Sequence, residues 1–267
     1  MNRIEKCFNE LNKRGEKALV CFLTSGDPDF ATTVKLVEEI AKSGADIVEL
    51  GIPFSDPLAD GPSIQSSSFR ALQAGATVRG VLDNVKSIRE RCDVPIVLMT
   101  YYNPIQKYGL ARFAEDAARS GADGVIMTDL PAEEAADWKT AADAVGIATV
   151  FLLAPTSTKD RIELAAKMGS GFMYCVSRTG VTGARNEAPV ELKELVGTIK
   201  LVTDLPVVVG FGISSPEHVK YVTQIADGAV VGSALVNIIA DSADPGDPVA
   251  NTGKFVRSLK EGAVGRE

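Results

Sequence analysis

The sequence predicts an α/β fold, a single-domain (β/α)8 barrel of the TIM type with an extra N-terminal helix. Three observations support this prediction: eight short apolar runs, helical patterns between them, and the lack of any long linker within 267 residues. Eight strand–helix alternations in about 250 residues match the barrel template, whereas a doubly wound sheet usually needs fewer strands. We therefore expect one barrel domain over residues 1–267.

The expected strands are short runs rich in apolar and β-branched residues. They cover residues 18–24, 46–50, 95–100, 123–128, 147–153, 171–176, 206–211 and 227–231. The stretches between them carry apolar residues at helical spacing, most clearly at 31–43, 110–120, 132–145, 158–168 and 189–203. Helices at 2–14 and 254–263 are expected to cap the barrel, and 241–253 is expected to be a surface loop.

Three similar segments join a helix to the next strand. They are SGADIVEL at 43–50, SGADGVIM at 120–127 and IADGAVVG at 225–232. We expect the glycine to end the helix in a left-handed conformation before the strand begins. This weak repetition favours one fold built from like units.

Charge and cysteine usage exclude several classes of protein. The formal charge of −7 argues against nucleic acid or an anionic membrane as the main partner. Cys7, Cys21, Cys92 and Cys175 lie far apart without a CxxC pair, which predicts reduced thiols in a reducing cytoplasm. There is no secretion signal and no long apolar run, so we expect neither export nor a membrane span. The single histidine, His218, argues against a histidine metal site, and we expect no metal.

Glu49 is the first candidate for chemistry, which in a barrel belongs at the C-terminal strand ends. Alternation puts Glu49 on the face opposite Val48 and Leu50. That apolar pair suits the layer between strands and helices, which turns Glu49 toward the barrel interior. A buried carboxylate there is a candidate acid or base with a raised pKa; the alternative is a frayed strand end that touches water.

The next loop, residues 53–62, has the sequence PFSDPLADGP. Its three prolines restrict the backbone, and its aspartates, Asp56 and Asp60, are brought back over the strand ends. Asp-Pro and Asp-Gly pairs are also ordinary turn formers, so this loop alone does not identify a site.

Glycines after the last three strands predict a phosphate site. Gly183, Gly212 and Gly232 can gather backbone N–H groups around a dianion, and Ser233 can add its own N–H and hydroxyl. No basic side chain is required. The alternative is that these glycines merely turn the chain.

The segment ELGIPFSDPLADGPSIQ, residues 49–65, resembles the signature of tryptophan synthase α subunits. Further motifs follow at successive strand ends: LP at 130–131, SRTGVTG at 177–183, GFGIS at 210–214 and GSA at 232–234. The resemblance extends from the TSGDP loop at 24–28 to about residue 240. It implies a barrel lyase that cleaves indole-3-glycerol phosphate to indole and glyceraldehyde 3-phosphate.

The same resemblance implies roles for individual residues. Glu49 would shuttle the proton, and Asp60 would stabilise the indole N–H as positive charge develops there. Tyr174 would line the site near the glutamate, unless it is a core tyrosine. Thr182 would hydrogen-bond the catalytic aspartate when a lid formed by 177–189 closes.

The family's indole pocket is largely apolar, and the matching positions here are Phe22, Met99, Tyr101 and Ile126. Thr128, at the end of the fourth expected strand, is polar, which leaves the individual pocket residues open.

The resemblance also implies a partner, a pyridoxal-phosphate-dependent β subunit in an αββα assembly that receives the indole. That cofactor would belong to the β subunit, and we expect none in this chain. Lysine is absent from the strand ends, which favours acid/base chemistry over an imine. Two alternatives remain: another phosphate-binding barrel enzyme, which would lack the 53–62 loop with Asp60, and a catalytically weak regulatory subunit, which the intact Glu49 and Asp60 disfavour.

Overall fold

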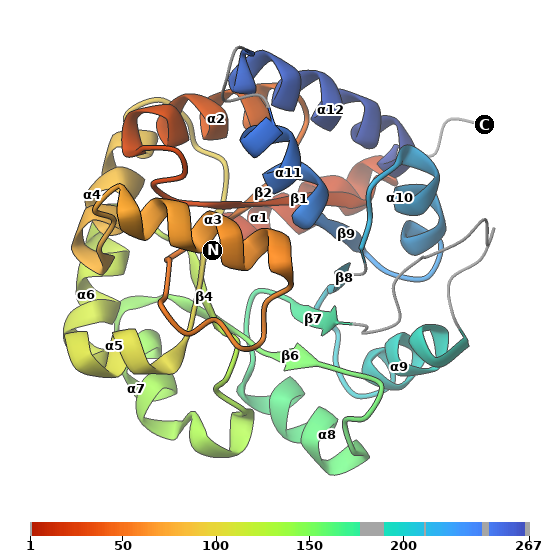
Figure 1. Cartoon of the computed structure of the whole chain (residues 1–267). Helices are drawn as coiled ribbons and strands as arrows, with labels where there is room; N and C mark the ends of the chain where they lie inside the picture. Colours follow the sequence, from red (N-terminus) through yellow and green to blue (C-terminus); the bar gives the residue numbers. More distant parts are fainter. Residues whose placement is uncertain (1, 177–189, 211, 242–245, 265–267) are drawn as a thin grey trace.

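The computed structural model describes residues 2–176, 190–210, 212–241 and 246–264, and its helices surround a ring of strands (Figure 1). All strand pairings are parallel, and the sheet has the order β5-β4-β3-β2-β1-β9-β8-β7-β6. The strands are β1 (Ala18–Thr24), β2 (Ile47–Gly51), β3 (Ile96–Thr100), β4 (Gly124–Met127), β5 (Ala148–Val150), β6 (Leu152–Leu153), β7 (Met173–Val176), β8 (Val207–Gly210) and β9 (Gly228–Val231). The predicted α/β barrel is confirmed.

The fifth expected strand, 147–153, is divided into β5 and β6 by Phe151. β5 pairs with β4 and β6 pairs with β7, so the two pieces are the two ends of the sheet order. The Phe151 carbonyl accepts a hydrogen bond of 3.2 Å from the N–H of Tyr174. The division therefore occurs within one of eight strand units, and the ring is nearly closed there.

The helices that the sequence predicts between strands are all present, with ends that differ by a few residues. The described helices are α1 (Arg3–Arg14), α2 (Phe30–Lys42), α3 (Pro62–Gln73), α4 (Val78–Arg89), α5 (Tyr102–Tyr108), α6 (Leu110–Ser120), η1 (Ala132–Glu134), α7 (Ala136–Val145), α8 (Lys159–Met168), α9 (Val190–Lys200), α10 (Pro216–Thr223), α11 (Ser233–Asp241) and α12 (Pro248–Ala263). None of these helices is long and apolar enough to cross a lipid bilayer.

The core has two layers, one between strands and helices and one inside the barrel. Val48 and Leu50 belong to the outer layer and Ile47 to the inner one, as the alternation predicts. α1 closes the N-terminal end of the barrel because its apolar residues pack into the inner layer. The rings of Phe8 and Phe172, for example, have centroids 6.0 Å apart. The expected cap at 2–14 is thus confirmed.

The C-terminal helix corrects a prediction. α12 begins at Pro248, inside the expected surface loop 241–253, and it packs against α2 and α10 in the outer ring rather than capping the barrel. The side chain of Asp247 accepts hydrogen bonds of 3.0 Å from the N–H groups of Val249 and Ala250. Aspartate before a helix and proline at its first position are start signals, and the loop interpretation overlooked them.

The aspartate of each repeated segment lies at the N-terminal end of a strand and binds a neighbouring strand. Asp46, Asp123 and Asp227 each accept a hydrogen bond from a backbone N–H of the preceding strand unit in the chain: Leu19 (2.8 Å), Ile96 (2.9 Å) and Val207 (3.0 Å) respectively. Asp46 pairs with Lys260 (2.7 Å), Asp123 pairs with Arg89 (2.6 Å) and Arg3 (3.1 Å), and Asp227 pairs with Lys17 (3.2 Å) and Lys200 (3.1 Å). These three carboxylates form what we call the aspartate clasps, which tie neighbouring strands together.

The left-handed glycine is confirmed in two of the three repeats. Gly44 has φ +108° and Gly121 has φ +97°, a region that residues with a side chain rarely adopt. In the third repeat the prediction is wrong, because Gly228 is the first residue of β9 and does not end a helix. There the Ala18 side chain and carbonyl lie 2.9 Å from where a Cβ would stand.

Candidate active site

A cavity of about 370 Å³, which we call the inner cavity, opens at the C-terminal ends of the strands. Its walls come from six strands and from the loops after β8 and β9. They include Phe22, Glu49, Met99, Tyr174, Gly210, Val230, Gly212, Ser214, Gly232 and Ser233. Parallel strands thus bring residues far apart in the sequence to one point, the end of a barrel where catalytic residues collect.

Glu49 lies in the wall of this cavity with an exposed fraction of 0%. Neither carboxyl oxygen has a hydrogen-bond partner among the described residues. Burial raises the pKa of Glu49 to about 8, because its surroundings solvate a carboxylate poorly. The carboxyl group is therefore largely protonated at neutral pH and can give a proton to a bound molecule.

Asp60 lies in the loop after β2 and is partly buried. Burial raises the pKa of its carboxyl group, while a hydrogen bond from the Tyr101 hydroxyl acts in the opposite direction. Asp60 lines a larger cavity that shares Ile64, Met99 and Gly210 with the inner cavity. The two acids therefore face connected space from different environments.

The helix after this loop is fastened to the loop after β1. The buried carboxylate of Asp27 accepts two hydrogen bonds from Arg70 of α3, of 2.8 and 2.7 Å. The hydroxyl groups of Thr24 and Ser67 lie 2.6 Å apart and are hydrogen-bonded. These bonds hold the middle and the last turn of α3, the helix that follows the loop carrying Asp60.

Tyr174 is buried in the inner layer of the core and reaches the inner cavity. Burial, together with the charges of Glu49 and Asp60, raises its pKa well above the ordinary value, so the hydroxyl stays protonated. The hydroxyl oxygen lies 2.5 Å from where a Cβ on Gly210 would stand. Glycine at position 210 is therefore what leaves room for the tyrosine.

The predicted phosphate residues converge as far as the structure describes them. Gly212, Gly232 and Ser233 all line the inner cavity, and Ser233 begins α11. Gly212 has φ +59°, which requires glycine in practice. Among the described residues of this wall there is no lysine, arginine or histidine. Gly183 and Thr182, the remaining predicted residues, lie outside the described residues.

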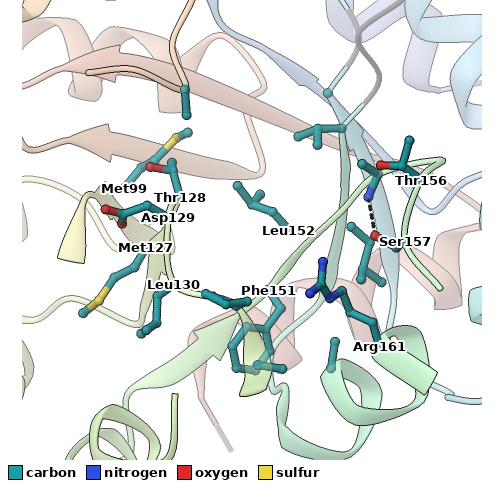
Figure 2. A pocket seen from close by; sticks show the side chains of 18 of the residues that line it. Met99, Met127, Thr128, Asp129, Leu130, Phe151, Leu152, Thr156, Ser157 and Arg161 are labelled. Carbon is teal, nitrogen blue, oxygen red and sulfur yellow. Dashed lines mark hydrogen bonds between the residues drawn. The ribbon is translucent and has the colours of Figure 1, made fainter. Parts of the chain in front are cut away.

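The larger cavity, of about 1120 Å³, adjoins the inner one. Figure 2 shows Met99, Met127 and Thr128 on one wall and Ser157 and Arg161 on the other. The mixture of sulfur, aliphatic and a few polar groups suits a flat apolar ring with one polar edge.

The structure places most of the residues predicted for the indole pocket. Phe22 and Met99 line the inner cavity, whereas Tyr101 and Thr128 line a small cavity with Asp60. Ile126 is fully buried in the inner layer and lines no described cavity. Its register partner in β3, Met99, does line the inner cavity.

Leu152 and Arg161 are among the residues of the larger cavity that the sequence analysis did not predict. Leu152 shares the inward face with Val150, so alternation along 147–153 could have identified it. Arg161, in the first turn of α8, also forms an ion pair of 2.7 Å with Glu133. Nothing in its local sequence signals a position at the cavity, since it depends on how α8 packs.

His218, in the first turn of α10, is half-buried. Its Nδ1 accepts a hydrogen bond of 3.3 Å from the N–H of Ser214, a residue of the inner cavity. His218 thus supports the loop after β8 from outside. No cluster of metal-ligating side chains is found in the described part of the chain.

Comparison with known proteins agrees with this arrangement over the whole chain. The family model described as tryptophan synthase alpha chain matches residues 8–264. The tryptophan synthase alpha chain of Geobacter sulfurreducens is 52% identical over 267 residues, covering 99% of this chain and 100% of its own length. That of Caldanaerobacter subterraneus subsp. tengcongensis is 47% identical over 261 residues, covering 98% and 99%.

Solved structures give the same result. Tryptophan synthase subunit alpha from Legionella pneumophila str. Paris matches with a TM-score of 0.91 and 38% identity, covering 98% of both chains. A chain of tryptophan synthase from M. tuberculosis, in an aminoacrylate-bound form, matches with a TM-score of 0.88 and 34% identity, covering 98% of this chain and 100% of that one. The predicted family is confirmed: the chain belongs to the tryptophan synthase alpha chains, lyases of tryptophan biosynthesis that cleave indole-3-glycerol phosphate.

Proposed function

We propose that Glu49, Asp60 and Tyr174 perform the cleavage of indole-3-glycerol phosphate in the inner cavity. Breaking the carbon–carbon bond requires indole to become a leaving group. The protonated Glu49 gives its proton to C3 of the ring, and the resulting carboxylate removes the proton of the glycerol hydroxyl beside the bond. The bonding electrons return to the ring, which leaves indole, glyceraldehyde 3-phosphate and a protonated Glu49.

The observation that carries this proposal is the isolated carboxyl group of Glu49. It is fully buried, has no hydrogen-bond partner among the described residues, and has a pKa raised to about 8. A general acid works best when its pKa lies near the working pH, because it must give and regain a proton in each turnover. A structural carboxylate would instead be paired, as the aspartate clasps are.

Asp60 stabilises the positive charge that develops at the indole N–H. Its position in the larger cavity supports this role, since Ile64, Met99 and Gly210 connect that cavity with Glu49. An ionised acid and a protonated acid that face one substrate divide acid/base work from electrostatic stabilisation. Tyr174, whose hydroxyl stays protonated, lies near both acids and completes the wall against the substrate.

The phosphate of the substrate is held by backbone N–H groups from Gly212, Gly232 and Ser233, with Gly183 as the fourth proposed contact. The N-terminus of α11 at Ser233 adds the positive end of a helix dipole. This mode of binding suits a chain with a net charge of −7. Thr182 is proposed, from the family resemblance, to hydrogen-bond Asp60 when the site closes.

A β subunit is the proposed partner, and the loop 53–62 with α3 is the proposed docking surface. Leu58 is 92% exposed and Phe69 is 62% exposed, which is unusual for large apolar side chains. Phe69 lines a groove of about 740 Å³ together with Phe54, Pro57 and Leu72 among others. Indole would pass from the adjoining larger cavity to the β subunit, which would carry pyridoxal phosphate in an αββα assembly.

The whole chain is proposed to form one domain that works in the cytoplasm without a cofactor of its own. All described elements belong to one sheet or to the helices around it, which supports a single domain over residues 1–267. Four free thiols, two of them buried, are in keeping with a reducing compartment.

Release of glyceraldehyde 3-phosphate from indole-3-glycerol phosphate tests the proposal. We expect Glu49→Gln to lower kcat by at least about a thousandfold, because a general acid contributes about that much. Circular dichroism and the thermal midpoint would show that the variant is folded. The matched control is Glu16→Gln, which removes a partly exposed carboxylate near the opposite end of the barrel. Turnover by Glu49→Gln at the wild-type rate would overturn the mechanism.

A further inference from the structure

We propose that Tyr101 is a positioning residue for the cleavage reaction: its hydroxyl orients the Asp60 carboxylate and fastens the loop 53–62 over the barrel mouth. The inference rests on the proposed role of Asp60. Tyr101 follows directly after β3, is 5% exposed, and lines the small cavity that also contains Asp60, Phe22 and Thr128.

The hydrogen bonds of the Tyr101 hydroxyl fix the direction of its proton. The N–H of Ala59 donates to the hydroxyl oxygen at 3.0 Å, and an N–H can only donate. The carboxyl group of Asp60 accepts from the hydroxyl, because their hydrogen bond lowers the pKa of Asp60 and raises that of Tyr101. The single tyrosine proton therefore points at Asp60, and the bond from Ala59 holds the oxygen in place.

Thr128 supports this arrangement from the next strand. The Thr128 hydroxyl has one proton, which faces both the Thr100 carbonyl at 3.2 Å and the Tyr101 oxygen. Its interaction with Tyr101 lowers the pKa of the tyrosine, as a donor does, so the tyrosine proton stays directed at Asp60. The polar residue at position 128, which does not suit an apolar indole pocket, has its explanation here.

The ring of Tyr101 holds the same loop at a second point. It lies against Phe54, with ring centroids 5.3 Å apart and a tilt of 35°. One side chain thus contacts the loop near its start, through Phe54, and near its end, through Ala59 and Asp60. Two separated contacts restrain the loop more strongly than either alone.

The charges are consistent with this geometry. Burial raises the pKa of Asp60, and the hydrogen bond from Tyr101 lowers it, so Tyr101 helps to keep Asp60 ionised. Burial and the charge of Asp60 raise the pKa of Tyr101 to about 12, so its hydroxyl keeps the proton. Both assigned contacts of this hydroxyl with the loop are internal to the protein, which separates a positioning role from contact with substrate.

The first test replaces the hydroxyl and keeps the ring. In Tyr101→Phe we expect kcat for indole-3-glycerol phosphate to fall about ten- to a hundredfold, the usual effect of losing a hydrogen bond to a charged group. KM should change less than kcat. The acidic limb of the kcat profile should move to higher pH, because Asp60 loses the donor that favours its ionised form.

A matched control exists in α5. The Tyr108 hydroxyl donates to Asp116 at 2.6 Å, which is the same pair of groups outside the site. Tyr108→Phe should leave kcat and the acidic limb unchanged. Thr128→Val, which removes the neighbouring hydroxyl, should move the acidic limb in the same direction by a smaller amount.

The outcomes separate this inference from the proposed function. If Asp60→Asn remains active, the role of Asp60 is wrong and the inference fails with it. If Asp60→Asn is inactive while Tyr101→Phe keeps the wild-type kcat and acidic limb, or changes KM alone, the positioning role is overturned and the proposed function stands. If Tyr101→Phe does not fold, an unmoved acidic limb in Thr128→Val overturns the inference.

Discussion

The aspartate clasps and Glu49 show two opposite ways of burying a carboxyl group. At the N-terminal ends of the strands, Asp46, Asp123 and Asp227 each accept a backbone N–H and pair with at least one cation. At the C-terminal ends, Glu49 is more deeply buried and has no partner among the described residues. Removing one member of a buried pair destabilises the fold, whereas an unpaired carboxyl group is free to exchange a proton.

The position of a carboxyl group along the strand decides whether it is paired or left without a partner. Glu49 stands three residues after Asp46 in the same segment, SGADIVEL. Asp46 meets the backbone of β1 and Lys260, whereas Glu49 meets the apolar walls of the inner cavity. The difference is one of environment, and changes to single partners can test it.

The largest effect on stability is expected at the most buried clasp. Asp123 is 4% exposed, and it pairs with Arg89, whose side chain is 10% exposed, at 2.6 Å. Asp123→Ala should lower the free energy of unfolding by about 3–5 kcal/mol, because it leaves a buried cation and the N–H of Ile96 unpaired. Urea denaturation of the purified variant measures this change.

Asp93→Ala is the matched control for that variant. Asp93 lies 4.0 Å from Arg3 with its side chain 93% exposed, so its loss should cost less than about 0.5 kcal/mol. If the two variants are equally stable, the carboxylate of a buried clasp contributes no more to stability than an exposed one does.

The next effect has the opposite sign and depends on pH. Glu49 has a pKa of about 8 in the fold against an ordinary value of 4.5, so its ionisation destabilises the folded state. This destabilisation is absent below about pH 4.5, grows with rising pH, and is complete above about pH 8. Glu49→Gln should therefore gain stability relative to the wild type as pH rises, by a few kcal/mol at pH 9.

Urea denaturation at pH 5, 7 and 9 checks this expectation. A stability difference that stays constant across these values would mean that Glu49 ionises normally in the fold. Glu16→Gln, which changes a partly exposed carboxylate, should show no comparable trend.

The smallest effect is expected where both cations of a clasp are partly exposed to water. Asp227 pairs with both Lys17 and Lys200, whose side chains are 36% and 39% exposed. Lys17→Ala should lower the free energy of unfolding by less than about 1 kcal/mol, because Lys200 remains and water screens both pairs. Lys17→Ala with Lys200→Ala should lower it by more than the sum of the single changes, and purely additive values would contradict shared pairing.

The sequence predicted the barrel because strand and helix periods alternate throughout the chain. It also predicted the inward direction of Glu49, since alternation within β2 needs no knowledge of the rest of the fold. Asp60 could be chosen over Asp56 through the family resemblance alone, because both lie in similar turns. The bond between Ala59 and Tyr101 joins residues 42 positions apart, and no local pattern carries that information.

The start of α12 illustrates a different kind of error. Proline and glycine between 241 and 253 suggested a loop, yet Pro248 occupies the first turn of the helix. Gly253 lies inside the helix. A Cβ at this position would stand 2.1 Å from a carboxyl oxygen of Glu39, which explains why the residue is glycine. Composition suggests a loop in such a case, and only the packing of α12 against α2 explains the glycine.

The N-terminal helix has a consequence for the order of folding. The side chain of Asn2 donates to the carbonyl of Asp123 at 2.8 Å, and Phe8 packs against Phe172. Because α1 precedes these partners in the chain, its contact with Phe172 can form only after residue 172 has been synthesised. Until then the apolar face of α1 has no complete inner layer to pack against. We therefore expect α1 to dock late in folding, when most strands of the barrel are in place.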